Sequence, residues 1–218
     1  MPYFGKAFFY NKGCFMIKVT LSILMVATLA GQDFIGNKKC KSCHKKKSSG
    51  AQYLKWEETN HANAFDVLKT PEAKTVAEER GILTNPWETP ECVRCHTTGF
   101  EKGGYEIKDQ AFWDQVTERG KPTKEVKRML ALQNVGCEVC HGPGSDYKSK
   151  KKMKAIFHGD ITMESVGMLK PSKETCVQCH NEESPSFHGF DFEEFFPKIS
   201  HPYPDGYREE MKQKELNK

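Results

Sequence analysis

The sequence predicts a mainly α-helical chain with long loops. Alternating apolar and polar runs, the pattern of half-buried strands, are nearly absent from its 218 residues. The stretch 51–69 instead carries four residues at helical spacing on one face: Leu54, His61, Phe65 and Leu68. Apolar residues make up only 37% of the chain, and the mean hydropathy is −0.68. Such a composition is poor in core material, so the fold needs apolar surface from another source.

A second helix is expected directly after the first. Thr70 has the residue type of an N-cap, Pro71 suits the first helical position, and Gly81 suits the C-terminal end. Long connections are expected over 82–91 and 142–157.

Further helices are predicted over 111–119 and 123–133, separated by a glycine and a proline. Helical spacing also relates the side chains of Phe192, Phe195, Phe196 and Ile199, although Pro197 favours a kink or a break there. The polar stretch from Arg208 predicts a surface helix.

Four copies of the pentapeptide Cys-x-x-Cys-His recur at uneven intervals, at 40–44, 92–96, 137–141 and 176–180. This is the attachment signature of c-type haem, in which both thiols bond to the porphyrin and the histidine binds the iron. We therefore expect four covalently bound haem c groups that form much of the core. Their attachment residues would be Cys40, Cys43, Cys92, Cys95, Cys137, Cys140, Cys176 and Cys179.

The cysteine pairs are also compatible with two other structures. Eight cysteines in four pairs could form two zinc sites with four thiolates each. They could also form a disulfide framework in an exported protein. Neither alternative requires a histidine directly after every second cysteine, so the pattern favours haem.

The histidine count suits iron ligation on both faces of each haem. Four histidines complete the motifs and would be proximal ligands: His44, His96, His141 and His180. Four others are candidates for the distal positions: His61, His158, His188 and His201. Of these, His61 lies on the apolar face of a predicted helix, where an imidazole without a partner is costly.

The N-terminus predicts export. The sequence Met16-Ile-Lys18 precedes an apolar run over 19–30 with small residues at its end, which is typical of a signal peptide cleaved after Ala30 or Gly31. The run is too short for an ordinary membrane-spanning helix, although an uncleaved anchor is the alternative. We expect residues 1–30 to be the N-terminal extension and signal, and 31–218 to be one tetrahaem domain. The ninth cysteine, Cys14, would leave with the signal.

Charge argues against a nucleic-acid partner. The formal charge of +4 falls to +1 when Lys6, Lys12 and Lys18 are removed, and each haem would add two propionates. Lysine runs at 45–47 and 148–154 are either solvated faces or a docking patch for an acidic redox partner.

These motifs, with their surroundings, resemble the tetrahaem cytochrome c-554 family, whose members carry electrons in association with hydroxylamine oxidation. The resemblance covers most of residues 38–202. Its specific stretches, besides the four motifs, are Trp56, Asn60 to Ala64, Gly99-Phe100, Gly103 to Tyr105, Val135-Gly136 and Gly142 to Gly144.

The resemblance implies a mostly helical fold with closely packed haems, some of them in parallel stacks. It also implies distal ligands: His61 for the haem of His141, His158 for that of His44, and His201 for that of His180. The haem of His96 would then have an open face, unless His188 closes it. The chain departs from the family at two points. His158 lies further from its Cys-x-x-Cys-His motif than the family pattern has it, and the segment after His180 is shorter.

We therefore expect an extracytoplasmic electron carrier that works with redox-partner proteins and has no catalytic residues. One alternative is a reductase of a small ligand such as nitric oxide at the open haem. Another is an electron-transfer subunit of a larger or polymeric complex.

The low apolar content leads to a first prediction. A variant in which serine replaces the eight motif cysteines should not fold stably, because cofactor binding supplies part of the native stability. Circular dichroism of this haem-free variant checks the expectation, and a native-like spectrum would contradict it.

Overall fold

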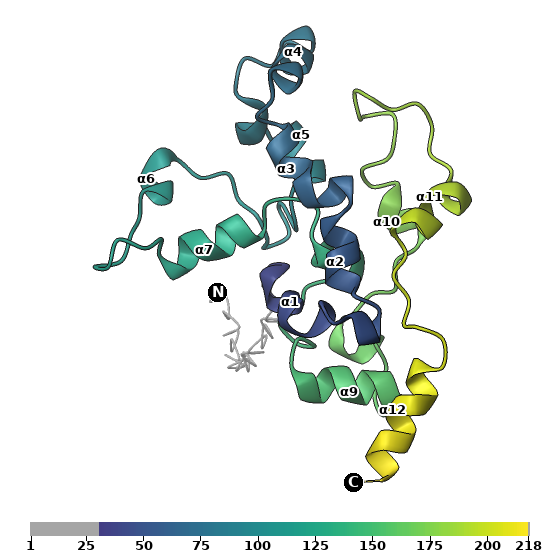
Figure 1. Ribbon diagram of the computed structural model, residues 1–218. Helices are drawn as coiled ribbons and strands as arrows, with labels where there is room; N and C mark the ends of the chain where they lie inside the picture. The colour runs from purple at the N-terminus through teal and green to yellow at the C-terminus, as the bar shows by residue number, and fades with distance from the viewer. Residues whose placement is uncertain (1–30, 218) are drawn as a thin grey trace, which may run out of the picture. The chain divides into compact units, whose positions relative to one another are not determined.

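Short helices joined by long loops make up the described part of the chain, residues 31–217 (Figure 1). The computed structural model has one compact unit that begins at Gln32. The described residues contain no strand, only two isolated bridges, Thr97 with Gln133 and Val116 with Pro122. The mainly helical class is confirmed. The predicted signal and Cys14 lie outside the described residues.

The α-helices within this range are short, from about one turn to about three turns long. Their bounds are α1 Lys38–His44, α2 Gln52–Glu57, α3 Ala64–Val67, α4 Pro71–Glu79, α5 Pro90–His96, α6 Gln110–Trp113, α7 Lys124–Ala131, α8 Cys137–His141, α9 Lys150–His158, α10 Lys173–Cys176, α11 Phe192–Ile199 and α12 Tyr207–Leu216. The 3-10 turns are η1 Lys47–Ser49, η2 Asn60–Asn63, η3 Pro86–Glu88 and η4 Glu164–Val166. No helix among them is long and apolar enough to cross a membrane.

The helix predicted over 51–69 is wrong as a single element. The chain forms α2, then η2, then α3, because Thr59 is extended with φ −92° and ψ 158°. The loop at 134–135 takes up backbone groups of this segment: Asn134 Oδ1 accepts from Phe65 N at 2.6 Å, and Val135 N donates to the His61 carbonyl at 3.1 Å. Tertiary hydrogen bonds therefore replace helical ones here.

The cap prediction for the next helix is confirmed. Thr70 Oγ1 accepts from Ala73 N at 3.3 Å, so it satisfies one of the free N–H groups of the first turn. Pro71 opens α4, and Gly81 follows the helix with φ +72°.

Three other predicted elements differ from the structure. The helix expected over 111–119 is only α6, because the chain then turns back with Thr117 N bonded to the Lys121 carbonyl at 2.8 Å. The expected 142–157 connection contains α9, which Ser149 caps by accepting from Lys152 N at 3.2 Å. Helix α11 runs through Pro197 and ends two residues later, at Ile199.

The predicted C-terminal surface helix is present as the largely exposed α12.

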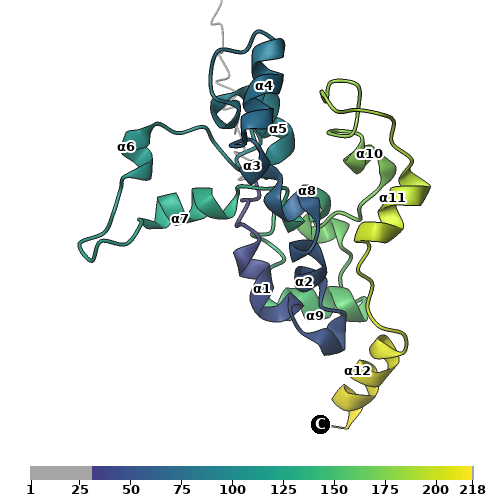
Figure 2. The same cartoon turned by 45° about the horizontal axis from the view of Figure 1, so that its top comes forward.

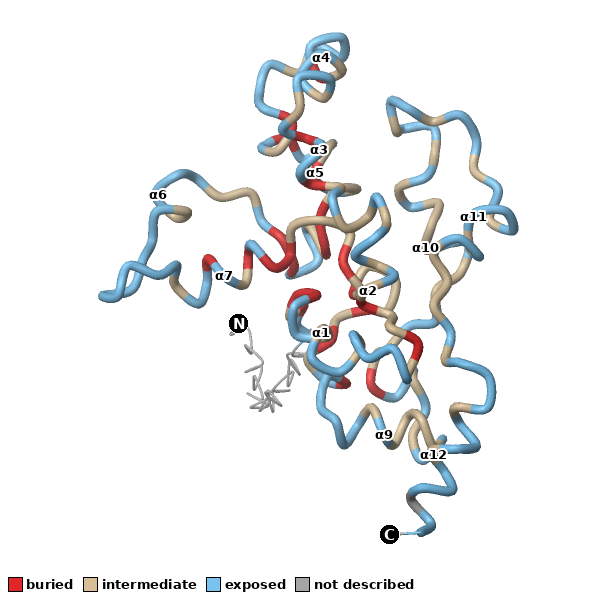
Figure 3. The backbone as a smooth tube through the Cα atoms, in the orientation of Figure 1, coloured by how far each residue is buried: buried red, intermediate tan, exposed pale blue. Residues whose placement is uncertain are grey.

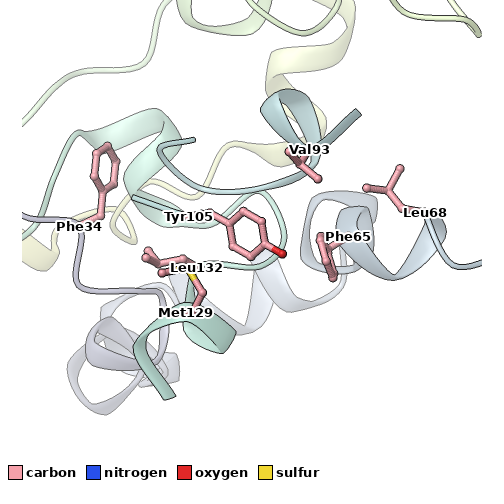
Figure 4. Packing of buried hydrophobic residues seen from close by; sticks show 7 residues of the cluster. All are labelled: Phe34, Phe65, Leu68, Val93, Tyr105, Met129 and Leu132. Carbon is pink, nitrogen blue, oxygen red and sulfur yellow. The ribbon is translucent and has the colours of Figure 1, made fainter. Parts of the chain in front are cut away.

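The apolar core lies around the second motif. Its buried members are Phe34, Phe65, Leu68, Val93, Tyr105, Met129 and Leu132 (Figure 4). Buried segments lie near α1, α2, α3, α5 and α7 (Figure 3). Among the residues from 167 to 217 whose exposure is described, none is buried by the polypeptide. The C-terminal part therefore takes little of its order from a protein core.

Thr98 ties the residues after the second motif to those before the third. Its N–H donates to the Leu132 carbonyl at 2.8 Å, and its hydroxyl donates to the Asn134 carbonyl at 2.8 Å. The same hydroxyl accepts from Gly136 N at 2.9 Å. Because Gly136 directly precedes Cys137, this network fixes where α8 begins relative to α5.

Leu132 offers a test of the core. Its side chain is 0% exposed, whereas that of Leu83 is 97% exposed. Leu132→Ala should lower the free energy of unfolding of the holoprotein by about 2–5 kcal/mol, because it leaves a cavity. Leu83→Ala is the matched control and should change it by less than about 0.5 kcal/mol. Denaturant unfolding measures both, and equal effects would contradict the assignment of the core.

Candidate functional site

Each Cys-x-x-Cys-His motif lies at the C-terminal end of a short helix. Helices α1, α5 and α8 end at His44, His96 and His141. The fourth motif begins at the end of α10, where His180 N donates to the Cys176 carbonyl at 3.0 Å and continues the helical turn. Positions i, i+3 and i+4 share one face of a helix. The two thiols and the imidazole of each motif are therefore presented together.

The motifs lie in two pairs. The thiol of Cys137 lies against that of Cys40 and lowers the Cys40 pKa. In the same way Cys179 lies against Cys95 and lowers the pKa of Cys95. Motifs one and three thus meet through their cysteines, and so do motifs two and four. Porphyrins attached at neighbouring cysteines would be closely packed within each pair.

Two pairs of imidazoles face each other at nearly equal spacing. The ring centroids of His61 and His180 are 6.0 Å apart, with an interplanar angle of 66°. Those of His141 and His201 are 6.1 Å apart, also at 66°. The structure pairs these rings differently from the resemblance: His61 lies opposite His180 and not His141, and His201 lies opposite His141 and not His180.

This spacing fits an axial iron. Two metal–imidazole bonds of about 2 Å, each extended by roughly 1 Å from the nitrogen to the ring centre, separate the centroids by about 6 Å. The interplanar angle is compatible, because each ring can rotate about its bond to the metal. Each pair joins one motif histidine to a histidine from a distant segment, and the residues present therefore fit haem iron.

Backbone carbonyls orient three of these imidazoles. Nδ1 of His96 donates to the Ala64 carbonyl at 2.5 Å. Nδ1 of His141 donates to that of Leu169 at 3.3 Å, and Nδ1 of His201 donates to that of Ile199 at 2.9 Å. A carbonyl oxygen only accepts, so the proton must be on Nδ1. This tautomer leaves Nε2 free to bind a metal, as second-shell contacts of ligating histidines generally do.

Burial keeps four candidate ligands neutral. Desolvation lowers the pKa of His44, His61, His141 and His180 below the ordinary histidine value. A lower pKa means that the uncharged imidazole is the form present at neutral pH. The uncharged form is also the one that binds metals.

Gln52 is a site residue that the sequence interpretation missed. Its Nε2 donates to the Ser49 carbonyl, and its buried Oε1 has no hydrogen-bond partner of good geometry. The Gln52 side chain faces His44, where it raises the imidazole pKa against the larger lowering by burial. Oε1 is therefore placed to accept from His44 once that ring is held by iron. A glutamine at a helix start gave no signal in the sequence.

Aromatic side chains line the fourth motif. The Phe190 ring stacks on His180 with centroids 4.8 Å apart and an interplanar angle of 16°. Phe195 of α11 continues this stack at 5.7 Å from Phe190. In both views α10 and α11 lie side by side (Figures 1 and 2). This half-buried aromatic wall suits a large flat apolar group beside His180.

The other histidines of the described chain lie outside the two opposed pairs. His96 has no second imidazole opposite it, at the spacing of the two pairs, within residues 31–217. His188 is exposed in the loop before Phe190. His158 ends α9, where its ring meets that of Phe157 at 5.1 Å. Ligation by His158 of the haem at His44 remains a prediction.

The rival uses of the cysteines find no support in the described range. All eight motif cysteines are free of disulfide bonds. No group of three or more His, Cys, Asp or Glu side chains between residues 31 and 217 is arranged to hold a bare metal ion.

Comparison with known proteins agrees with this geometry. Residues 39–142 match the family described as "Cytochrome c554 and c-prime". The chain is 31% identical over 198 residues to cytochrome c-554 of Nitrosomonas europaea, a match that covers 84% of this chain and 74% of that relative. A structure of cytochrome c554 from the same organism in its reduced state superposes with a TM-score of 0.53 at 27% identity, covering 80% of this chain and 86% of that one.

The His61–His180 pairing predicts the effect of one substitution. His61→Ala should open one iron, because a distal ligand is lost, and electron paramagnetic resonance should show one additional high-spin ferric haem. Paramagnetic NMR then assigns the changed haem through contacts of its methyl groups with Cys176 and Cys179. His188→Ala is the control and should leave the spectrum unchanged. A changed haem attached at Cys137 and Cys140 would contradict this pairing.

Proposed function

The chain belongs to the cytochrome c554 family of multihaem c-type electron carriers, and we propose that it is an exported member that holds four haems. The observation that carries this proposal is the presence of two pairs of opposed imidazoles, with ring centroids 6.0 and 6.1 Å apart. Each pair includes the histidine of a motif whose two thiols lie on the same helix face. Haem c supplies one-electron chemistry at iron when it is bound.

The described residues support a carrier more than a catalyst at two of the four sites. His61 with His180, and His141 with His201, would occupy both faces of their irons. Two fixed ligands leave no coordination position for a substrate, and little needs to move when the oxidation state changes. Contacts between motifs one and three, and between two and four, favour a path across the molecule.

One observation favours a second function at the His96 site. His96 is fixed by the Ala64 carbonyl, and the described residues place no imidazole opposite it at the pair spacing. An open iron there would bind a small ligand such as nitric oxide. In that case His96 would be the proximal ligand of a reductase centre, supplied with electrons from the neighbouring fourth motif.

The proposal includes a periplasmic location and redox proteins as partners. Covalent attachment of haem c takes place outside the cytoplasm, which agrees with the signal predicted for residues 1–30 and with a periplasmic location. The partners would be redox proteins. The exposed lysines at 45–47 follow the first motif directly, and those at 148–154 lead into and open α9. Their charge would speed encounter with an acidic partner.

Intact mass and a redox titration test the function together. The exported protein should exceed its polypeptide mass by four haems, and it should take up four electrons in the titration. Electron paramagnetic resonance should show low-spin iron for the paired sites and high-spin iron for the site of His96. A mass without added haem would contradict the proposal, and only low-spin signals would exclude the reductase alternative.

A further inference from the structure

A buried carboxylate lies inside the third haem-attachment motif. Glu138 follows Cys137 directly, and its side chain is among the largest fully buried ones in the described residues, at 2% exposure. Buried glutamates are rare unless they are paired, because an ionised carboxylate loses its hydration. The function proposed above does not use this residue.

Both oxygens of Glu138 accept hydrogen bonds from backbone N–H groups. Oε1 accepts from Ile35 at 2.9 Å and from Gly144 at 2.6 Å. Oε2 accepts from Gly36 at 2.7 Å and from Ile35 at 3.1 Å. All these partners are donors, and a protonated carboxyl would use one oxygen as a donor itself. These hydrogen bonds therefore stabilise the ionised form of the Glu138 carboxyl group.

No cation in the described chain touches this carboxylate. The guanidinium of Arg128 attracts Glu138 from a distance, but it donates its hydrogen bonds to the carbonyls of Phe34 at 3.2 Å and Gly103 at 2.7 Å. Burial is the largest effect and raises the pKa of Glu138 overall, while the three backbone donors and Arg128 act in the opposite direction and stabilise the ionised form. The negative charge is thus held mainly by peptide dipoles, without a counter-ion in contact.

The other pair of motifs has a different charge environment. There Glu183 acts electrostatically on Cys95 and forms an ion pair with Arg94 of the second motif. Glu91 and Glu174 act on Cys92 and Cys176. The side chains of Arg94 and Glu183 are 44% and 64% exposed, so water and the opposite charge both weaken their field. Glu138 also acts electrostatically on Cys40 and Tyr147, beside the first and third motifs.

We propose that the buried charge of Glu138 selectively lowers the reduction potentials of the haems attached at the first and third motifs. This inference rests on the proposed function, because it requires haem at these motifs. A fixed negative charge stabilises ferric over ferrous iron, since the ferric centre has one more positive charge. The effect on the reduction potential is large for a haem near the buried charge, and small for a haem on the other side of the molecule. Glu138 is thus a positioning and potential-setting residue that makes this pair the better electron donor.

Glu138→Gln tests the charge. The variant should raise the midpoint potentials of the two haems bound at Cys40/Cys43 and Cys137/Cys140, and it should leave the other two unchanged. Glu183→Gln is the matched control, with a carboxylate lost at the second pair, and should not shift the first pair. Potentials are assigned to single haems by NMR-monitored redox titration of holoprotein that carries four haems.

Glu138→Gln removes the charge and also an acceptor for backbone N–H groups. A second variant is needed to separate the electrostatic effect from this structural effect. Arg128→Met removes the attracting cation and should lower the same two potentials, a shift of opposite sign; Arg128→Lys should restore them. Unchanged potentials in Arg128→Met, or an equal shift of all four haems in Glu138→Gln, would overturn the inference. A wild-type protein without haem would instead refute the proposed function, so the two failures are distinguishable.

Discussion

The opposed placement of imidazoles from distant segments is the interaction on which this structure depends. His61 and His180 come from opposite ends of the described chain, and their rings face each other at 6.0 Å. His141 and His201 do the same at 6.1 Å. None of the described residues after 166 with an assigned exposure is buried by protein. These imidazole contacts and the aromatic stack on His180 therefore help to position the C-terminal part, together with the Arg94–Glu183 ion pair and the packing of Tyr203 and Tyr207 on Phe157. Haem would supply the remaining apolar surface.

The electrostatics follow from the same arrangement. Backbone carbonyls at Ala64, Leu169 and Ile199 fix the ring nitrogen that carries the proton. Burial lowers the pKa of His44, His61, His141 and His180 and so favours their uncharged form. Glu138 is the exception, a charge retained in the interior, and three peptide N–H groups hold it there. A protein that exchanges electrons needs such fixed dipoles, because they set potentials without having to move.

The sequence predicts what depends on local spacing. The four motifs, the cap at Thr70 and the mainly helical class are all readable from a few adjacent residues. The single helix expected over 51–69 was wrong because Asn134 and Val135 take its hydrogen bonds from far along the chain. The imidazole pairs also differ from the expected ones, since which distant rings meet is a tertiary property. Gln52 and Glu138 matter through burial, which no local pattern indicates.

Crystallographic location of iron tests the central claim most directly. An anomalous difference map collected at the iron absorption edge should show four peaks in the holoprotein. One should lie between the rings of His61 and His180, and another between those of His141 and His201. Iron at other positions, or neither of these two places occupied, would contradict the arrangement described for this chain.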